Sequence, residues 1–428
     1  MISAREAPIQ PFRLNLQLPK MLTVKEELKI TRAALERDPQ SPEYRYRLAH
    51  FLYTLDGFDE AIDLLQDLSR DVTEFRVFHL LGTALLARET RRDSSAAKQV
   101  AKRAVDAAGN RHERARALAS LGKAHTRLGE IDDGRARFLE ALDAHIANKD
   151  AYKRLAMLDF QAERSQEAFD FAEQMLANGV IHARVLGVRP LALAKLGRMD
   201  DAHEAFGFDT FLHQLIPSPP PAWPTIEAFN RDLATELLGH PGIRYERYGA
   251  ASAHTWRIDE PSLARSRVVP ELQKLIQREA SAYVARLPAA GHPWLRDRPS
   301  SAFLHNWCVI TDGDGYEEWH VHQNGWLSGA YYVDVPEFIV NGEGPEGCVA
   351  FGLPPGIVGE DRHAEFGIRM FRPRSGLLML FPAHSFHRTF AHKGDRRRIC
   401  FAFDIAPEWH APEAYAQTTS ETNGAMHA

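Results

Sequence analysis

The sequence predicts a multidomain α + β protein, with an N-terminal α-solenoid and a C-terminal double-stranded β-helix, or jelly roll, with flanking helices. Residues 25–206 contain almost no proline and repeat apolar residues at the i, i+3, i+4 spacing of amphipathic helices. Beyond residue 300, short apolar runs alternate with Gly, Pro and Asp turns without intervening helices. That pattern is typical of an antiparallel sandwich or barrel, and the number of runs fits a jelly roll.

A proline-rich stretch, LIPSPPPAWP, separates the two parts. It has five prolines in ten residues, cannot be helical and favours a stiff, extended connector. The expected division, in chain order, is an N-terminal segment (1–24), helical repeats (25–214), the linker (215–224), the jelly-roll domain (225–412) and a C-terminal tail expected to be disordered (413–428).

A small residue recurs early in the second helix of each predicted helical pair. These residues are separated by 36, 37, 34 and 34 positions, and they are Ala61, Ala97, Gly134, Ala168 and Ala202. A period near 34 with a small residue at a close helix crossing is what a stacked helix-turn-helix array needs. With the segments TRLGEIDDGRARFLEAL and AKLGRMDDAHEAF, the region resembles a tetratricopeptide repeat array of about five units; a generic helical bundle is the alternative. The resemblance implies a concave face that binds peptides or protein partners, or packs on a neighbouring domain.

Composition narrows the class of partner and the compartment. The net charge of −5 gives no electrostatic argument for nucleic acid, and we expect no nucleic-acid partner. The sequence has no run of eighteen apolar residues and no apolar stretch at its N-terminus, so neither a membrane partner nor secretion is expected. Three cysteines without paired spacing, Cys308, Cys348 and Cys400, indicate reduced thiols in a cytoplasmic protein.

The C-terminal domain is expected to begin with two helices, at 225–238 and 262–287. The strands expected after them are 301–311, 317–323, 326–335, 347–352, 376–382, 385–391 and 397–405. The Gly-rich segment 341–372 is expected to be a long loop, a candidate lid over the site.

Histidines on two of these expected strands suggest a metal site. His320 and His322 stand at i and i+2, so their side chains project from one face of strand 317–323. His387 follows strand 376–382, and Arg398 comes eleven residues later. Three such ligands leave open coordination positions; imidazole suits zinc, copper, iron or nickel, and a nearby basic residue suits iron that also binds a dicarboxylate and dioxygen. A histidine pair on a strand is otherwise a solvated or hydrogen-bonded face.

Three ordered motifs make this prediction more specific. HVHQNGWLSGAYYV, PRSGLLMLFPAHSFH and RICFAFD make residues 301–407 resemble the 2-oxoglutarate/Fe(II) oxygenases related to prolyl hydroxylases. The resemblance implies Fe(II) as cofactor and 2-oxoglutarate as cosubstrate. It implies His320 and His387 as metal ligands and Arg398 as the partner of the distal carboxylate of 2-oxoglutarate, with Arg396 in reserve. Tyr332 matches a hydroxyl that holds the same carboxylate, and Thr389 could add another.

The sequence departs from the wider superfamily at the second ligand. The usual pattern is His-x-Asp, and here His322 takes the carboxylate position. Three neutral imidazoles leave the metal with its full positive charge, which changes the charge balance of the site. The predicted metal ligands are His320, His322 and His387. A one-step shift offers His322 with Asn324 as a weak amide ligand and His320 outside the ligand set.

The predicted function is therefore that of a 2-oxoglutarate-dependent dioxygenase. Its substrate is expected to be a peptide, a protein or an amino-acid-like small molecule that is hydroxylated at a C–H bond. The repeats are expected to bind substrate or a protein partner. The alternative is a tetratricopeptide scaffold whose cupin-like domain is catalytically inactive, and the missing carboxylate leaves it open.

Overall fold

The computed structural model describes residues 12–407, which form two compact units. The helical unit comprises residues 22–171 together with 247–250. The sheet unit comprises residues 12–21, 172–246 and 251–407. The predicted C-terminal tail, 413–428, lies outside the described residues.

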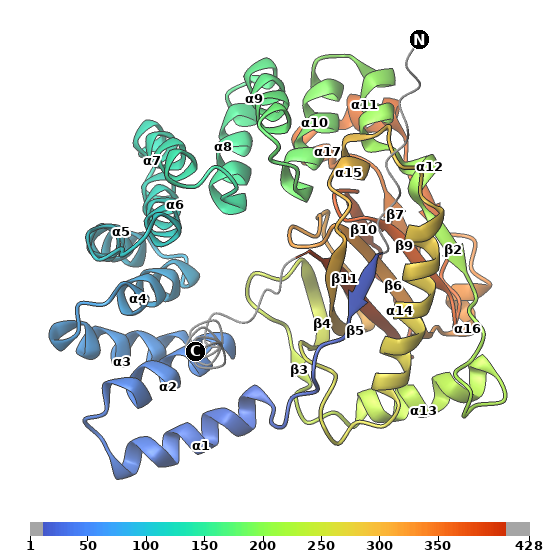
Figure 1. The fold of residues 1–428 in the computed structure, drawn as a ribbon, viewed down its shortest axis with the longest axis horizontal. Coiled ribbons are helices and arrows are strands. Elements are labelled where there is room, and N and C mark those ends of the chain that lie inside the picture. Colours follow the sequence, from blue (N-terminus) through green and yellow to red (C-terminus); the bar gives the residue numbers. More distant parts are fainter. Residues whose placement is uncertain (1–11, 408–428) are drawn as a thin grey trace, which may run out of the picture. The chain divides into compact units, whose positions relative to one another are not determined.

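The helical unit is built from consecutive antiparallel helices joined by short turns (Figure 1). Several begin at polar caps: the side chains of Ser41, Asn110 and Asn148 each accept a hydrogen bond from the backbone N–H three residues later. The helices are α1 (Val24–Arg37), α2 (Pro42–Thr54), α3 (Phe58–Asp71), α4 (Phe75–Ala87), α5 (Arg91–Asp106), α6 (Arg111–Arg127), α7 (Ile131–Ala144) and α8 (Lys149–Gln161), with α9 (Ser165–Ala177) at the division between the units. The predicted α-solenoid is confirmed.

The small residues that recur in the repeats are all buried. Ala61 and Ala97 have no exposed surface, and a methyl group on Gly134 would lie 2.5 Å from Cγ2 of Thr126 in α6. Helices can approach this closely only where the side chain at the crossing is small. The sequence period therefore marks the helix crossings.

Replacing Ala61 by leucine is expected to destabilise the helical unit by about 1–3 kcal/mol, because α3 packs on α2 and α4 without space for a larger side chain. Denaturant unfolding of the whole chain measures the change. The matched control is Ala33→Leu, at an exposed position of α1, which should stay within about 0.5 kcal/mol of wild type. Equal stability of the two variants would contradict a close crossing at Ala61.

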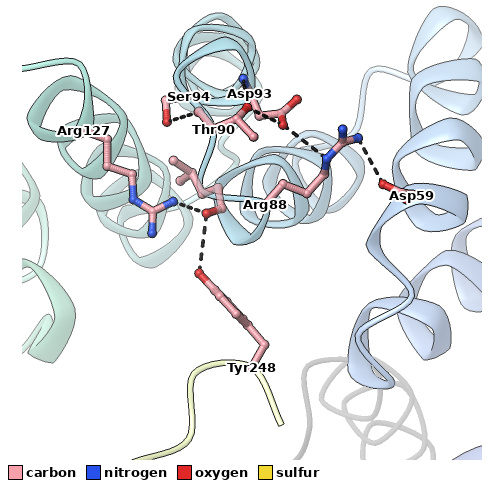
Figure 2. A network of polar contacts seen from close by, with 8 residues as sticks. Asp59, Arg88, Thr90, Asp93, Ser94, Arg127 and Tyr248 are labelled. Atoms are coloured by element: carbon pink, nitrogen blue, oxygen red, sulfur yellow. Dashed lines mark hydrogen bonds and ion pairs between the residues drawn. The ribbon is translucent and has the colours of Figure 1, made fainter. Parts of the chain in front are cut away.

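Polar contacts near the end of α4 connect successive helices (Figure 2). Arg127 of α6 donates a hydrogen bond to the carbonyl of Leu86, and the hydroxyl of Tyr248 lies 3.5 Å from the same oxygen. Nε of Arg88 lies 3.2 Å from a carboxylate oxygen of Asp93, in the first turn of α5. The contacts of Arg127 and Tyr248 satisfy the carbonyl of Leu86, one of the last of α4, which have no partner within the helix.

Two sheets form the core of the sheet unit, and this is the predicted double-stranded β-helix. Within residues 12–407, the large sheet has the strand order β2-β9-β6-β11-β5-β4-β3, with β1 pairing parallel to β5, and the small sheet has the order β10-β7-β8. The strands are β1 (Arg13–Asn15), β2 (His213–Leu215), β3 (Arg244–Tyr245), β4 (Ser252–Ile258), β5 (Ser301–Glu317), β6 (Leu327–Asp334), β7 (Val349–Phe351), β8 (Arg369–Phe371), β9 (Leu378–Pro382), β10 (His387–Thr389) and β11 (Arg398–Ala406).

Two long helices, α13 (Ile226–Leu238) and α14 (Val269–Arg286), pack on the large sheet (Figure 1). α13 agrees with the expected helix 225–238 and is capped by Thr225. α14 begins seven residues later than expected, with Pro270 in its first turn, where a missing N–H costs nothing. Short helices complete the unit: α12 (Phe208–Phe211), α15 (Pro293–Arg296), α16 (Glu337–Val340), α17 (Pro355–Val358) and α18 (Glu360–Phe366). No helix among residues 12–407 is long and apolar enough to cross a membrane.

The expected domain boundary at residue 214 is not where the compact units divide. Two helices near the end of the expected repeats, α10 (Ala183–Lys195) and α11 (Met199–Phe206), belong to the sheet unit, where they pack on α17 and α18. The rings of His203 and Phe366 stack with centroids 4.2 Å apart. The helical periodicity of the sequence continues through α11. It therefore gives no sign that α10 and α11 pack on helices of the sheet unit.

Two further expectations differ from the structure. Only Glu317 of the expected strand 317–323 lies in a named strand; beyond it, His320 and His387 form a single bridge. Segment 341–372 is not a loop, because it contains β7, α17, α18 and β8 and packs on α10 and α11. Leu215 ends β2, and residues 216–225 contain neither helix nor strand.

Candidate metal centre

Three histidine rings meet where the chain after β5 bridges to β10. The ring centroids of His320 and His387 are 4.2 Å apart, and that of His322 lies 5.2 Å and 4.9 Å from them. One ring nitrogen from each lies within 4.8 Å of the others, and Nε2 of His320 and Nε2 of His322 are 3.3 Å apart. The structure thus brings together the three predicted ligands, which lie up to 67 positions apart in the sequence.

Hydrogen bonds at Nδ1 decide which ring nitrogens face the centre of this cluster. Nδ1 of His320 and of His387 each donates to the backbone carbonyl two residues earlier, at 2.7 and 2.9 Å. A carbonyl only accepts, so the neutral rings carry their proton on Nδ1 and present the Nε2 lone pair. Nδ1 of His322 lies 2.6 Å from Oδ1 of Asp404. All three rings are held with Nε2 available.

This arrangement fits a divalent transition metal. Lone pairs of neighbouring imidazoles repel each other at 3.3 Å unless a cation or a proton lies between them. Imidazole is a ligand for iron, zinc, copper and nickel. Asn324 lies in the turn after His322 and is half-buried. The alternative set with Asn324 requires His320 to stand apart, whereas its Nε2 lies next to that of His322.

The three rings differ in charge preference. Burial lowers the pKa of His387 well below its ordinary value, and burial together with His322 lowers the pKa of His320. Burial opposes charge on His322 as well, but the charge and hydrogen bond of Asp404 outweigh it and raise the pKa of His322. When the pH of the metal-free protein is lowered, His322 is therefore the first of the three rings to take up a second proton.

Metal affinity is expected to fall as the pH drops through the raised pKa of His322, because the metal must displace a proton that this ring holds more firmly than a free histidine. The same shift stabilises the metal-free fold below about pH 6.5, the ordinary histidine pKa, and this stability is lost as pH rises through the raised pKa. Titration with Co(II) between pH 6 and 8.5 measures the affinity. An affinity independent of pH over that range would contradict this assignment of the proton.

A partly enclosed cavity adjoins the cluster and extends to Arg398. Its wall includes His322, His387 and Arg398, and most other lining side chains are apolar. Arg398 is only 2% exposed; its Nη1 donates to the carbonyl of Gly347 at 2.8 Å, while its Nε has no hydrogen-bond partner and no carboxylate pairs with it among residues 12–407. A buried guanidinium without a counter-ion is costly. The cavity therefore fits an anion, and a planar guanidinium matches a carboxylate with two parallel N–H donors.

The predicted hydroxyl groups line the same cavity. Burial raises the pKa of Tyr332, so this phenol stays neutral and keeps a proton to donate. The Thr389 hydroxyl accepts a hydrogen bond from the backbone N–H of Glu317 at 2.9 Å and retains its own proton. Asn324 is not among the lining residues. Arg396, the reserve candidate, is exposed.

Two acidic residues near the site were not found from the sequence. Asp404 contacts His322, and Glu317 lines the cavity from the end of β5. An aspartate inside the apolar strand RICFAFDI is a signal that a buried partner exists, because a lone buried carboxylate is costly. The sequence does not distinguish Glu317 from Glu318.

The family comparison agrees with this geometry. Residues 305–404 match the model of the family described as "Putative 2OG-Fe(II) oxygenase". The predicted resemblance is confirmed. The match covers most of β5, all of β6, β7, β8, β9 and β10 and nearly all of β11, and therefore the three histidines and Arg398. This stretch of the sheet unit is thus similar to the 2OG-Fe(II) oxygenases, and such a family implies Fe(II) and 2-oxoglutarate.

Solved structures similar to parts of the chain include both repeat proteins and a hydroxylase. A thermophilic TPR protein of Thermus thermophilus is 23% identical, with 36% of this chain and 82% of that chain covered and a TM-score of 0.31. The type IV pilus biogenesis factor PilW is 17% identical, with coverages of 43% and 83% and a TM-score of 0.37. A Pseudomonas putida prolyl-4-hydroxylase is 12% identical, with coverages of 50% and 100% and a TM-score of 0.31. No curated protein matches the chain significantly.

Proposed function

We propose that the chain is a non-haem Fe(II)- and 2-oxoglutarate-dependent dioxygenase that hydroxylates a C–H bond. The observation that supports this most is the pairing of two features in one cavity. The cluster of His320, His322 and His387 lies at one end, where the rings of His322 and His387 line the cavity, and at the other a buried guanidinium has no carboxylate partner among residues 12–407. A metal cation and a dicarboxylate are complementary to these two ends.

In this proposal His320, His322 and His387 hold Fe(II), and Arg398 holds the distal carboxylate of 2-oxoglutarate. Bound Fe(II) and 2-oxoglutarate supply the dioxygen chemistry that no amino-acid side chain provides. Tyr332 and Thr389 donate hydrogen bonds to the same carboxylate as Arg398, which fixes the orientation of the cosubstrate.

Apolar side chains in the cavity wall exclude water from the reacting region. Val349, Phe351 and Phe381 are buried and line the cavity together with His322 and His387. A dry wall strengthens the interaction of Arg398 with an anion and protects reactive species from side reactions. His320 is the only half-buried ring of the three, and we propose that substrate approaches from its side.

The proposed substrate is a peptide, a protein or an amino-acid-like small molecule. Stacked helical pairs such as α1 to α8 present extended surfaces to chain segments. We propose that the repeats bind the substrate or a protein partner, and that the hydroxylation takes place in the sheet unit.

Succinate formation from 2-oxoglutarate tests the proposal. With Fe(II), 2-oxoglutarate and oxygen, wild type should release succinate slowly, and a substrate should stimulate release. Peptide and small-molecule fractions of a cell extract, added separately, identify the substrate class. A scaffold with an inactive domain would release no succinate with either fraction, and that result would contradict the proposal.

A further inference from the structure

A buried carboxylate stands directly behind the histidine that replaces the usual carboxylate ligand. Oδ1 of Asp404, in β11, lies 2.6 Å from Nδ1 of His322, on the side of the ring away from the cluster. Asp404 is 7% exposed. By contrast, Nδ1 of His320 and of His387 rests on neutral backbone carbonyls. Among the three rings, His322 alone has a charged acceptor.

Two neighbouring residues are shaped to hold this carboxylate. The hydroxyl of Ser328, in β6, donates to the same Oδ1 at 2.7 Å. Gly325 lies so close that a Cβ atom there would be 3.1 Å from both Cγ and Oδ1 of Asp404. The hydrogen bond from Ser328 and the space left by the missing side chain of Gly325 both fix the position of the Asp404 carboxylate. The contact with His322 is therefore a specific feature of the site.

The site needs negative charge that its ligands do not provide. Three neutral imidazoles around a divalent cation leave the full charge of the metal in a buried region, which is costly. A carboxylate hydrogen-bonded to the far nitrogen of a ligand fixes the ring orientation and tautomer and raises the basicity of the ligand. From behind His322, Asp404 does both without touching the metal.

We propose that Asp404 is the positioning residue of the metal centre, and that it replaces, through His322, the carboxylate that the ligand set lacks. The inference rests on the proposed function, since it concerns the same metal. It also gives a role to motif residues that the metal ligands leave unexplained, namely Gly325, Ser328 and the aspartate that ends RICFAFD. β11 then serves both ends of the site, because Arg398 and Asp404 stand six residues apart on one face of that strand.

The test is Co(II) binding to the full chain with Asp404→Asn, which keeps the shape and removes the charge. We expect the Kd for Co(II) to rise roughly 10–100-fold, with a shift of the visible Co(II) bands. Gly325→Ala and Ser328→Ala leave the carboxylate in the chain but disturb its position, and both should weaken Co(II) binding in the same direction. They keep the test valid if Asp404→Asn does not fold. The matched control is Asp159→Asn, a buried carboxylate of the helical unit that pairs with Arg164, and it should bind Co(II) like wild type.

A second readout does not need the metal. In metal-free wild type, ¹⁵N NMR of the ring should show Nδ1 of His322 protonated and strongly hydrogen-bonded, and Asp404→Asn should lose this signature. If Asp404→Asn, Gly325→Ala and Ser328→Ala all bind Co(II) with wild-type affinity and an unchanged band position, the inference about Asp404 is wrong. The proposed function would still stand. If wild type itself binds no Co(II), the proposed function fails and the inference fails with it, so the two failures are distinguishable.

Discussion

Replacing Arg398 by methionine will strongly weaken 2-oxoglutarate binding and leave the metal-free protein at least as stable as wild type. The guanidinium is buried and has no carboxylate partner among residues 12–407, so it costs desolvation energy until an anion arrives. Losing one partner of such a pair costs binding about 2–5 kcal/mol. This corresponds to roughly 30- to several thousand-fold in Kd.

Two measurements check this expectation. Calorimetric titration with 2-oxoglutarate, with Mn(II) in place of Fe(II), gives the Kd, and thermal unfolding without metal gives the stability. Arg398→Lys keeps the charge but loses the two parallel donors, so it should bind 2-oxoglutarate more weakly than wild type.

Arg397→Met is the matched control for Arg398→Met. This neighbouring arginine is exposed and pairs with Asp312, so its loss should leave the Kd for 2-oxoglutarate unchanged. An unchanged Kd in Arg398→Met, or a marked loss of metal-free stability, would contradict the anion-binding role.

Replacing His387 by alanine will remove metal binding. Its ring completes the cluster from β10, with its centroid 4.2 Å from that of His320 and 4.9 Å from that of His322. Losing a ligand atom should cost more than the roughly 10–100-fold that the loss of an outer partner costs. Titration with Co(II) measures the affinity.

His392→Ala serves as the control for His387→Ala. His392 is also a buried histidine of the sheet unit, but its ring hydrogen bond is to the carbonyl of Thr311, and it lies outside the cluster. This variant should be destabilised and still bind Co(II) with wild-type affinity. Equal Co(II) affinities of the two variants would exclude His387 as a ligand.

Periodic patterns in the sequence were sufficient to predict much of the fold. The spacing of small residues such as Ala61 and Ala97 predicted buried helix crossings, and both are buried completely. The RICFAFD motif and strand alternation together favoured Arg398 over the two arginines before it, with Arg396 in reserve, and Arg398 alone of the three is buried. The first prediction depends on a sequence repeat of about 34 residues, and the second on the two-residue period of a strand together with the motif.

Features that depend on which element packs on which could not be predicted in this way. α10 and α11 keep the helical period of the repeats but pack on α17 and α18, so residue 214 is not the division between units. The contact between Asp404 and His322 spans 82 residues and exists only because β6 and β11 pair in one register. A single sequence gives no register for distant strands.

The most direct test of the central claim is anaerobic titration of the wild-type chain with Fe(II) and 2-oxoglutarate together. The account predicts a weak visible charge-transfer band that needs both components, is absent in His387→Ala and in Arg398→Met, and persists in Arg397→Met. A wild-type chain that gives no band, or a band that survives in His387→Ala, would contradict the claim that the three histidines and Arg398 form one Fe(II) and 2-oxoglutarate site.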